Sequence, residues 1–182
     1  LLVPDAVVLV SISPRRLNTE LPAVLASQPD GVMLRLGELN LTGLELAGAV
    51  QQARRIMDDQ QCDHMPLWIV PGEITVDDAA KLMALGATAV AIDSWCEELV
   101  AEVRDVQHNV SSALGYPPLS GSNNQQWVDW IEHDLASQLE RFGGLLHSMR
   151  YQPPAERLAT ISQEWAETLD IPSLNLPFKS DA

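Results

Sequence analysis

Few residues of this chain have the type and spacing that catalysis requires. His133 and His147 fall on similar faces of one expected helix, with Glu140 midway between them. Such groups can transfer protons or bind a metal ion, but a spacing of seven residues is too wide to chelate one ion. Cys96 lies near the start of another expected helix, where the neighbouring Glu97 opposes the reactive thiolate form. Packing and surface roles are therefore favoured for these residues.

Polar residues also follow two of the expected strands. Glu38 and Asn40 lie in the loop LGELNLTG and could bind a substrate, or they could form an ordinary polar loop and helix cap. Arg15 and Arg16 form the only basic spot at the carboxyl end of an expected strand, where they could offset the charge of an anionic substrate or simply be solvated. Both interpretations stay open for each pair.

Composition excludes several classes of protein. The chain has 182 residues, of which 46% are hydrophobic and 20% are charged, as in a globular domain. Its formal charge of −14 disfavours a nucleic acid or an anionic membrane as partner. Cys62 and Cys96 show no disulfide or zinc-site pattern, and no apolar run is long enough to span a membrane. We therefore expect a cytoplasmic protein with no membrane or nucleic-acid partner.

The first half of the chain alternates short apolar runs with helical patterns, which predicts βαβ units and a parallel sheet. The runs are continuous rather than alternating, as expected for strands covered on both faces. Three helices are expected between them, and Thr75 with Gly86 marks the start and end of the third. The expected strands are 6–12, 31–36, 66–70 and 88–92, and the expected helices are 19–27, 42–59, 75–85 and 97–110.

The rhythm changes to helices alone after a loop rich in Ser, Pro, Gly and Asn. The first helix carries apolar residues from Val128 to Met149 at a spacing of three and four, although Gly143 and Gly144 weaken or kink it. Pro153 and Pro154 are expected to start a second helix, so that the two form a helical hairpin. Its expected inward face is Leu158, Ile161, Trp165 and Leu169. The predicted organisation is a βα domain over 1–110, a linker over 111–124, and a helical hairpin with an irregular tail over 125–182.

Four parallel strands could form a small doubly wound sheet or half of a (β/α)8 barrel. The segment VLVSISPRRLN has no GxGxxG turn after the first strand, which favours the half barrel. We therefore predict an α/β fold of about four parallel βα units, a partial (β/α)8-type barrel, followed by the helical hairpin. A half barrel leaves sheet edges and an apolar face uncovered, so a protein partner or self-association is expected to complete it.

Residues 66–92, PLWIVPGEITVDDAAKLMALGATAVAI, resemble the seventh and eighth strand region of FMN-dependent barrels. The family is the FMN-binding domain of glutamate synthases, in which a glycine turn precedes a helix that ends in an LGA-AV motif. VVLVSISP is similar to the fifth strand of such barrels, DGVMLRL to the sixth, and LELAGAVQQARRIM to the following helix. The resemblance covers roughly residues 6–95 and implies the C-terminal half of the barrel.

The resemblance also implies a flavin phosphate held by the turns after the last two strands. It assigns Gly72 and Glu73 to the first turn, and Asp93 and Ser94 to the second. The second turn departs from the family pattern, because Asp93 stands where a glycine is expected and its carboxylate would repel a phosphate. The fifth-strand lysine of the family is absent as well, with Ser11 or Ser13 at its place.

Three functions remain open at this point. The chain could be a flavin-dependent oxidoreductase subunit or fragment of the glutamate synthase type, with FMN as its cofactor. Alternatively, it could be a catalytically silent structural or assembly subunit, derived from a barrel, that binds a partner protein and no flavin. The third is a cofactor-free barrel enzyme that acts on a small-molecule ligand. No catalytic residue and no metal site is assigned.

Overall fold

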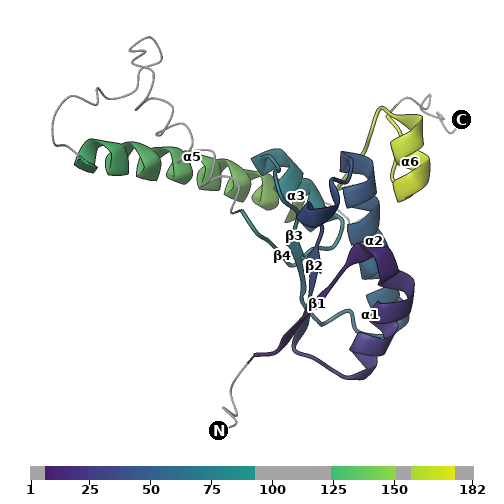
Figure 1. Ribbon diagram of the computed structural model, residues 1–182. Coiled ribbons are helices and arrows are strands. Elements are labelled where there is room, and N and C mark those ends of the chain that lie inside the picture. Colours follow the sequence, from purple (N-terminus) through teal and green to yellow (C-terminus); the bar gives the residue numbers. More distant parts are fainter. Residues whose placement is uncertain (1–6, 93–123, 151–156, 175–182) are drawn as a thin grey trace, which may run out of the picture.

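The computed structural model of the protein describes residues 7–92, 124–150 and 157–174, and Figure 1 shows their arrangement. Four parallel strands form one sheet, and their order in the sheet follows their order in the chain. The strands coincide with the four predicted runs, although each is shorter than predicted. They are β1 Leu9–Ile12, β2 Gly31–Arg35, β3 Leu67–Val70 and β4 Ala89–Val90.

The helices predicted between the strands are confirmed to within two residues at each end. Two short 3₁₀ turns, η1 and η2, follow β1 and β2 directly. The helix predicted over 97–110 lies outside the described residues, as does the loop over 111–123. The elements between the strands are η1 Pro14–Arg16, α1 Leu17–Ala26, η2 Gly37–Leu39, α2 Gly43–Asp59 and α3 Val76–Ala84.

One face of the sheet carries the main hydrophobic core. Val32 and Leu34 of β2 and Leu67 and Ile69 of β3 are almost completely buried on this face. They pack in one cluster with residues of α1, α2 and α3, including Met57 of α2. Burial of such apolar side chains supplies the main stabilisation of the fold. All three crossover helices therefore contribute to the core on the same face of the sheet.

The ends of α2 and α3 are fixed by local sequence signals. Thr42 and Thr75 are the N-caps, and each forms a reciprocal capping box with the acidic residue three positions later. Gly86 follows the end of α3 with φ +114°, a conformation that side chains disfavour, as the sequence predicted for a closing glycine. A Cβ at Gly86 would also lie 2.6 Å from Cγ of Arg54, so the residue must be small.

The C-terminal helices do not form the expected hairpin. α5, Asn124–Arg150, is one continuous helix of 27 residues that packs against α3, whereas α6, Gln163–Leu169, packs against α2 (Figure 1). α5 begins at Asn124, the last residue of the predicted linker, and continues through Gly143 and Gly144. The helical pattern had indicated one apolar surface for both helices, but each packs on a different part of the α/β body.

The second C-terminal helix is shorter than predicted. Ser162 caps its N-terminus by accepting a hydrogen bond from the Trp165 backbone N–H, and residues 157–161 before it are not helical. Thr160 instead forms a parallel bridge with Ser173. The predicted inward face is therefore only partly correct, since Leu169 is buried but Ile161 is 70% exposed. In the described ranges, no helix is both long enough and apolar enough to cross a membrane.

Candidate functional site

The expected phosphate turn follows β3 at the carboxyl edge of the sheet. Gly72 has φ +83°, a conformation that glycine adopts readily and other residues do not. A Cβ on Gly72 would lie 2.9 Å from Cα of Gly37, and a Cβ on Gly37 would lie 2.8 Å from Cα of Gly72. The two glycines thus allow the backbones after β2 and β3 to touch. The space that a side chain at Gly72 would fill is occupied by the Gly37 backbone.

This geometry tests whether a flavin phosphate fits the turn. The space beside the Gly72 Cα holds protein backbone, and the next residue, Glu73, brings an exposed carboxylate to the same turn. A carboxylate repels a phosphate dianion at close range. Both features count against a flavin phosphate at Gly72 and Glu73, the described half of the expected cradle. Asp93 and Ser94, which the resemblance assigns to the other half, lie outside the described residues.

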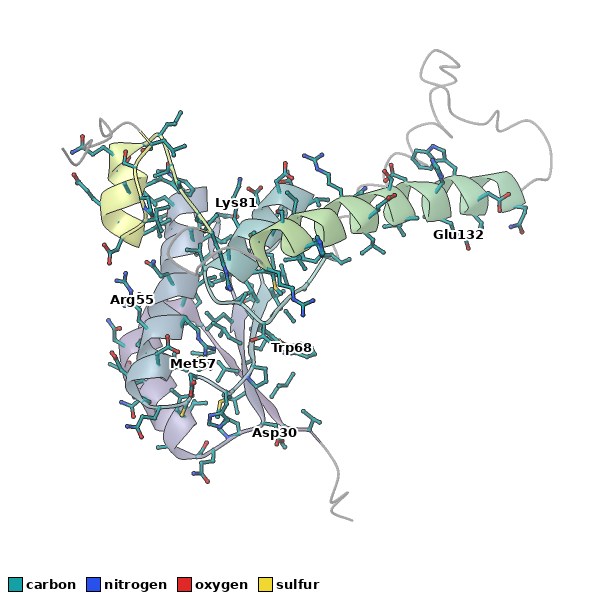
Figure 2. The ribbon with its side chains drawn as sticks, turned by 180° about the vertical axis from the view of Figure 1, so that it is seen from behind. Asp30, Arg55, Met57, Trp68, Lys81 and Glu132 are labelled. Atoms are coloured by element: carbon teal, nitrogen blue, oxygen red, sulfur yellow. The ribbon has the colours of Figure 1, made fainter. Side chains whose placement is uncertain are left out.

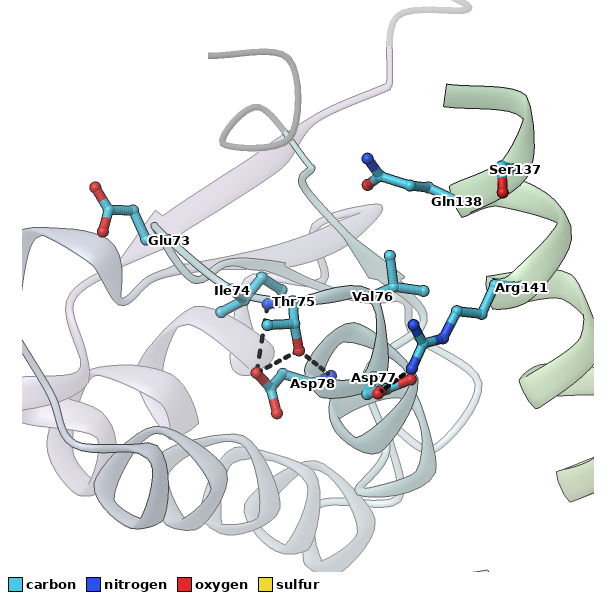
Figure 3. Close-up of a pocket in the computed structure, with 9 residues that line it drawn as sticks. All are labelled: Glu73, Ile74, Thr75, Val76, Asp77, Asp78, Ser137, Gln138 and Arg141. Carbon is cyan, nitrogen blue, oxygen red and sulfur yellow. Dashed lines mark hydrogen bonds and ion pairs between the residues drawn. The ribbon is translucent and has the colours of Figure 1, made fainter. Parts of the chain in front are cut away.

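A pocket of about 460 Å³ lies beside this turn, between the start of α3 and the C-terminal half of α5. Figure 3 shows Arg141 of α5 reaching Asp77 at the start of α3, whereas the carboxylate of Asp78 points toward Thr75. Nη2 of Arg141 lies 2.6 Å from Oδ2 of Asp77, and this ion pair closes one side of the pocket. The other polar residues at the pocket wall are Glu73, Thr75, Asp78, Ser137 and Gln138.

Asp78 is committed to the structure of α3. Its Oδ2 accepts a hydrogen bond of 2.7 Å from the Thr75 hydroxyl, and its Oδ1 lies 2.9 Å from Nζ of Lys81. Burial raises the pKa of Asp78, but the hydrogen bonds from Lys81 and Thr75 and the charge of Lys81 outweigh burial and lower the pKa below its ordinary value. Asp78 is thus a stable carboxylate whose partners belong to its own helix. This environment does not produce a general acid.

The loop residues that could have bound a substrate make local contacts. Glu38 pairs with Arg35 at 3.0 Å, and Asn40 ends η2 in the left-handed conformation with φ +47°. Arg16 lies 3.4 Å from Glu20 on the next turn of chain. These contacts favour the simpler of the two interpretations for Glu38, Asn40 and Arg16, namely a polar loop with solvated surface pairs. Arg15 also lies on the surface, next to β1.

The histidines of α5 are not brought into a metal centre. His133 and His147 are both exposed. Within the described ranges, the structure places no three histidine, cysteine or acidic side chains close enough to hold a metal ion. Cys62 is a free thiol that is partly buried, whereas Cys96 falls outside those ranges.

The face of the sheet opposite the helices carries a surface that the sequence did not identify. The strand register places Ser11, Met33, Trp68 and Ala89 side by side in one row across all four strands. Trp68 is 42% exposed although it lies in an inner strand, next to fully buried Leu67. Figure 2 shows Trp68 on the side of the sheet away from Met57 of α2. We call these four residues the open-face row.

The open-face row can be recognised in the sequence only when the register of the strands is known. In PLWIV every residue is apolar, so the run itself gives no alternation between two faces. The parallel pairing then aligns Trp68 with Met33 of β2 and Ala89 of β4, and Met33 with Ser11 of β1. The row contains no charged residue, in a chain whose formal charge is −14. An uncharged, exposed tryptophan surface is typical of a protein-binding site.

The comparisons with known proteins do not identify a family for this chain. No protein-family model matches the chain, and neither the curated proteins nor the solved structures contain a match. What the structure establishes is a mixed α/β fold with a four-stranded parallel sheet. The resemblance to FMN-binding barrels of the glutamate synthase type remains an expectation from the sequence.

Proposed function

We propose that this chain is a structural or assembly subunit related to (β/α) barrels, which binds a partner protein and carries no flavin. The open-face row carries the proposal, because Trp68 at its centre is exposed in a row of four residues without charge. Large aromatic residues in uncharged surroundings contribute most of the energy of protein interfaces. The partner would cover this face as the strands on the opposite side cover the inner face of a complete barrel.

The arrangement of the strands supports the relationship to barrels. Their order is sequential, and α1, α2 and α3 contribute to one core on one face. A doubly wound sheet has helices on both faces and reverses its strand order at the site where ligands bind. In a (β/α)8 barrel, the helices cover only the outer face and the strand order never reverses. A half barrel therefore accounts for both the strand order and the open face.

Site-specific cross-linking in the native cell tests the proposal. A photoreactive phenylalanine analogue replaces Trp68 in the full chain, and a matched variant carries it at Gln60, an exposed residue beyond α2 on the helix side. We expect a discrete cross-linked species with the analogue at position 68 and none with it at position 60. Equal cross-linking at both positions, or none at position 68, would contradict the proposed interface.

The second candidate is the FMN-dependent oxidoreductase-like subunit related to the glutamate synthase FMN domain. The observation that favours it is the sequential parallel sheet with Gly72 in a positive-φ turn at the carboxyl end of β3. In that case backbone N–H groups of the second turn, at Asp93 and Ser94, would have to outweigh the repulsion of a phosphate by the carboxylates of Asp93 and Glu73. Catalysis would then depend on strands contributed by a partner.

The visible absorption spectrum distinguishes the two candidates. The full chain is mixed with excess FMN, desalted, and compared with the untreated protein between 350 and 500 nm, roughly the range in which protein-bound flavin absorbs. The assembly proposal predicts no retained flavin bands. A stoichiometric flavin spectrum that survives desalting would reject that proposal in favour of the oxidoreductase.

A further inference from the structure

The N-terminal half of α5 extends beyond the α/β body. Its C-terminal half packs against α3, where Phe142 and Leu145 join Val76 and Ala79 in a small hydrophobic cluster. The helix then continues away from the sheet toward Asn124, as Figures 1 and 2 show from opposite sides. Glu132, labelled in Figure 2, lies on this extended part. A projecting helix of this kind gains most of its stability from packing of an apolar face against another surface.

Apolar side chains form a line that begins on the extended part and ends beside the contact with α3. Val128, Ile131, Leu135 and Leu139 follow one another at steps of three, four and four residues, which places them on one side of an α-helix. We call these four residues the α5 stripe. Val128 is 44% exposed and Leu139 is 51% exposed, while Ile131 and Leu135 are partly buried. A line of this spacing is the surface by which one helix packs against another.

Acidic residues border the α5 stripe on both sides. Glu132 and Asp134 occupy the positions that flank the apolar seam of a paired helix, where charges select the partner. Asp134 also accepts a hydrogen bond of 2.6 Å from Gln138, a neutral donor that leaves its charge in place. No lysine or arginine occurs between residues 124 and 140. The border of the stripe is therefore uniformly negative.

This charge pattern decides among the candidate occupants. The same region of a second copy would place acidic borders against each other, which is unfavourable. Residues 97–110 of this chain contain four carboxylates and one arginine, so they would meet the same repulsion. A partner with basic residues beside its apolar seam would form ion pairs with Glu132 and Asp134 instead. The complementary chemistry is thus apolar and basic.

We propose that the α5 stripe docks an amphipathic helix of a partner protein whose apolar seam is bordered by lysine or arginine. This adds a second surface to the proposed assembly role, and it depends on different residues from the open-face row. The cross-link at Trp68 and the experiment below can therefore succeed or fail independently of each other.

Binding of two synthetic helical peptides to the full chain tests this inference. Both peptides carry leucine along their seam, and the seam is bordered by lysine in one and by glutamate in the other. Fluorescence anisotropy at low ionic strength measures the affinity for each labelled peptide. We expect the lysine peptide to bind at least about tenfold more tightly than the glutamate peptide, and added salt to reduce this preference.

Two charge-reversal variants with the same change in net charge provide the control. Glu132→Lys with Asp134→Lys reverses the borders of the stripe, and we expect it to prefer the glutamate peptide. Asp129→Lys with Glu140→Lys reverses two carboxylates on the opposite side of the same helix, and we expect it to keep the preference of the native protein. Circular dichroism checks that both variants retain their helix content.

Three results would overturn the inference. Equal binding of both peptides, or binding of neither, would show that the stripe does not select a basic helix. The same loss of preference in both double variants would assign the effect to net charge alone. A dimer in sedimentation velocity that Leu135→Asp dissociates, without peptide binding, would identify a second copy of the chain as the occupant.

Discussion

The contact between Gly37 and Gly72 defines the carboxyl edge of the sheet at the level of single residues. The resemblance implies that residue 72 is a glycine so that a phosphate can approach the backbone closely. In the structure the neighbouring backbone of Gly37 takes that space, with 2.9 Å between its Cα and the position of a Cβ on Gly72. The need for glycine at this position is therefore explained by the fold itself, whether or not a ligand binds nearby.

Replacement of Gly72 tests this explanation directly. Gly72→Ala introduces a Cβ at φ +83° against the Gly37 backbone, and we expect the free energy of unfolding to fall by about 2 kcal/mol or more. Gly48→Ala is the matched control, because a Cβ there meets no atom within 4 Å inside α2. We expect the control to raise stability by roughly 0.5–1 kcal/mol. Urea denaturation measures both, and an unchanged stability of Gly72→Ala would disprove the steric explanation.

Asp78 gives the capping of α3 a pH dependence. Its pKa is lowered in the folded state, so its contribution to stability is present at neutral pH and is lost as the pH falls through the lowered folded pKa. We expect Asp78→Asn to be less stable than the native protein at pH 7. The difference in stability should shrink as the pH falls through the folded pKa of Asp78. Asp59→Asn, at the C-terminal end of α2, serves as the control. A difference that is constant from pH 7 to pH 3 would contradict the role of the charge.

The elements show where sequence patterns determine structure and where they do not. The capping residues Thr42 and Thr75 and the closing glycine Gly86 act through neighbours in sequence, so the bounds of α2 and α3 could be predicted. α6 depends instead on contacts with the distant α2, where Trp165 approaches Gly43. A helical spacing in the sequence cannot specify such a docking site. It therefore predicted a hairpin that the fold does not form.

The attachment of α5 to α3 rests more on packing than on charge. Phe142 joins the small cluster with Val76 and Ala79, whereas Arg141 and Asp77 form an ion pair at the surface. We expect Phe142→Ala to lower the stability of this contact by about 2 kcal/mol, and Arg141→Met to lower it by less than about 1 kcal/mol. Hydrogen exchange of the amides from 137 to 146 measures the local loss. A larger effect of Arg141→Met would show that the ion pair dominates.

At the scale of the whole molecule, α1, α2 and α3 cover one side of the sheet, and among the described residues the other side carries the open-face row. The sequence predicted four parallel strands from their continuous apolar runs, and it predicted a partner because a half barrel leaves sheet edges and an apolar face uncovered. It could not identify the residues at the open face, since Trp68 and Leu67 are adjacent and equally apolar in the chain. Only the pairing of Met33 with Trp68 and of Trp68 with Ala89 shows which residues share that face.

Hydroxyl-radical footprinting of Trp68 tests the central claim, that a partner protein covers the open face. The oxidation of Trp68 is measured by mass spectrometry in the purified chain and in the native cell extract, with the partly buried Trp165 of α6 as internal reference. We expect rapid oxidation of Trp68 in the purified chain and strong protection in the extract, with no change at Trp165. Equal oxidation of Trp68 in both samples would contradict the account.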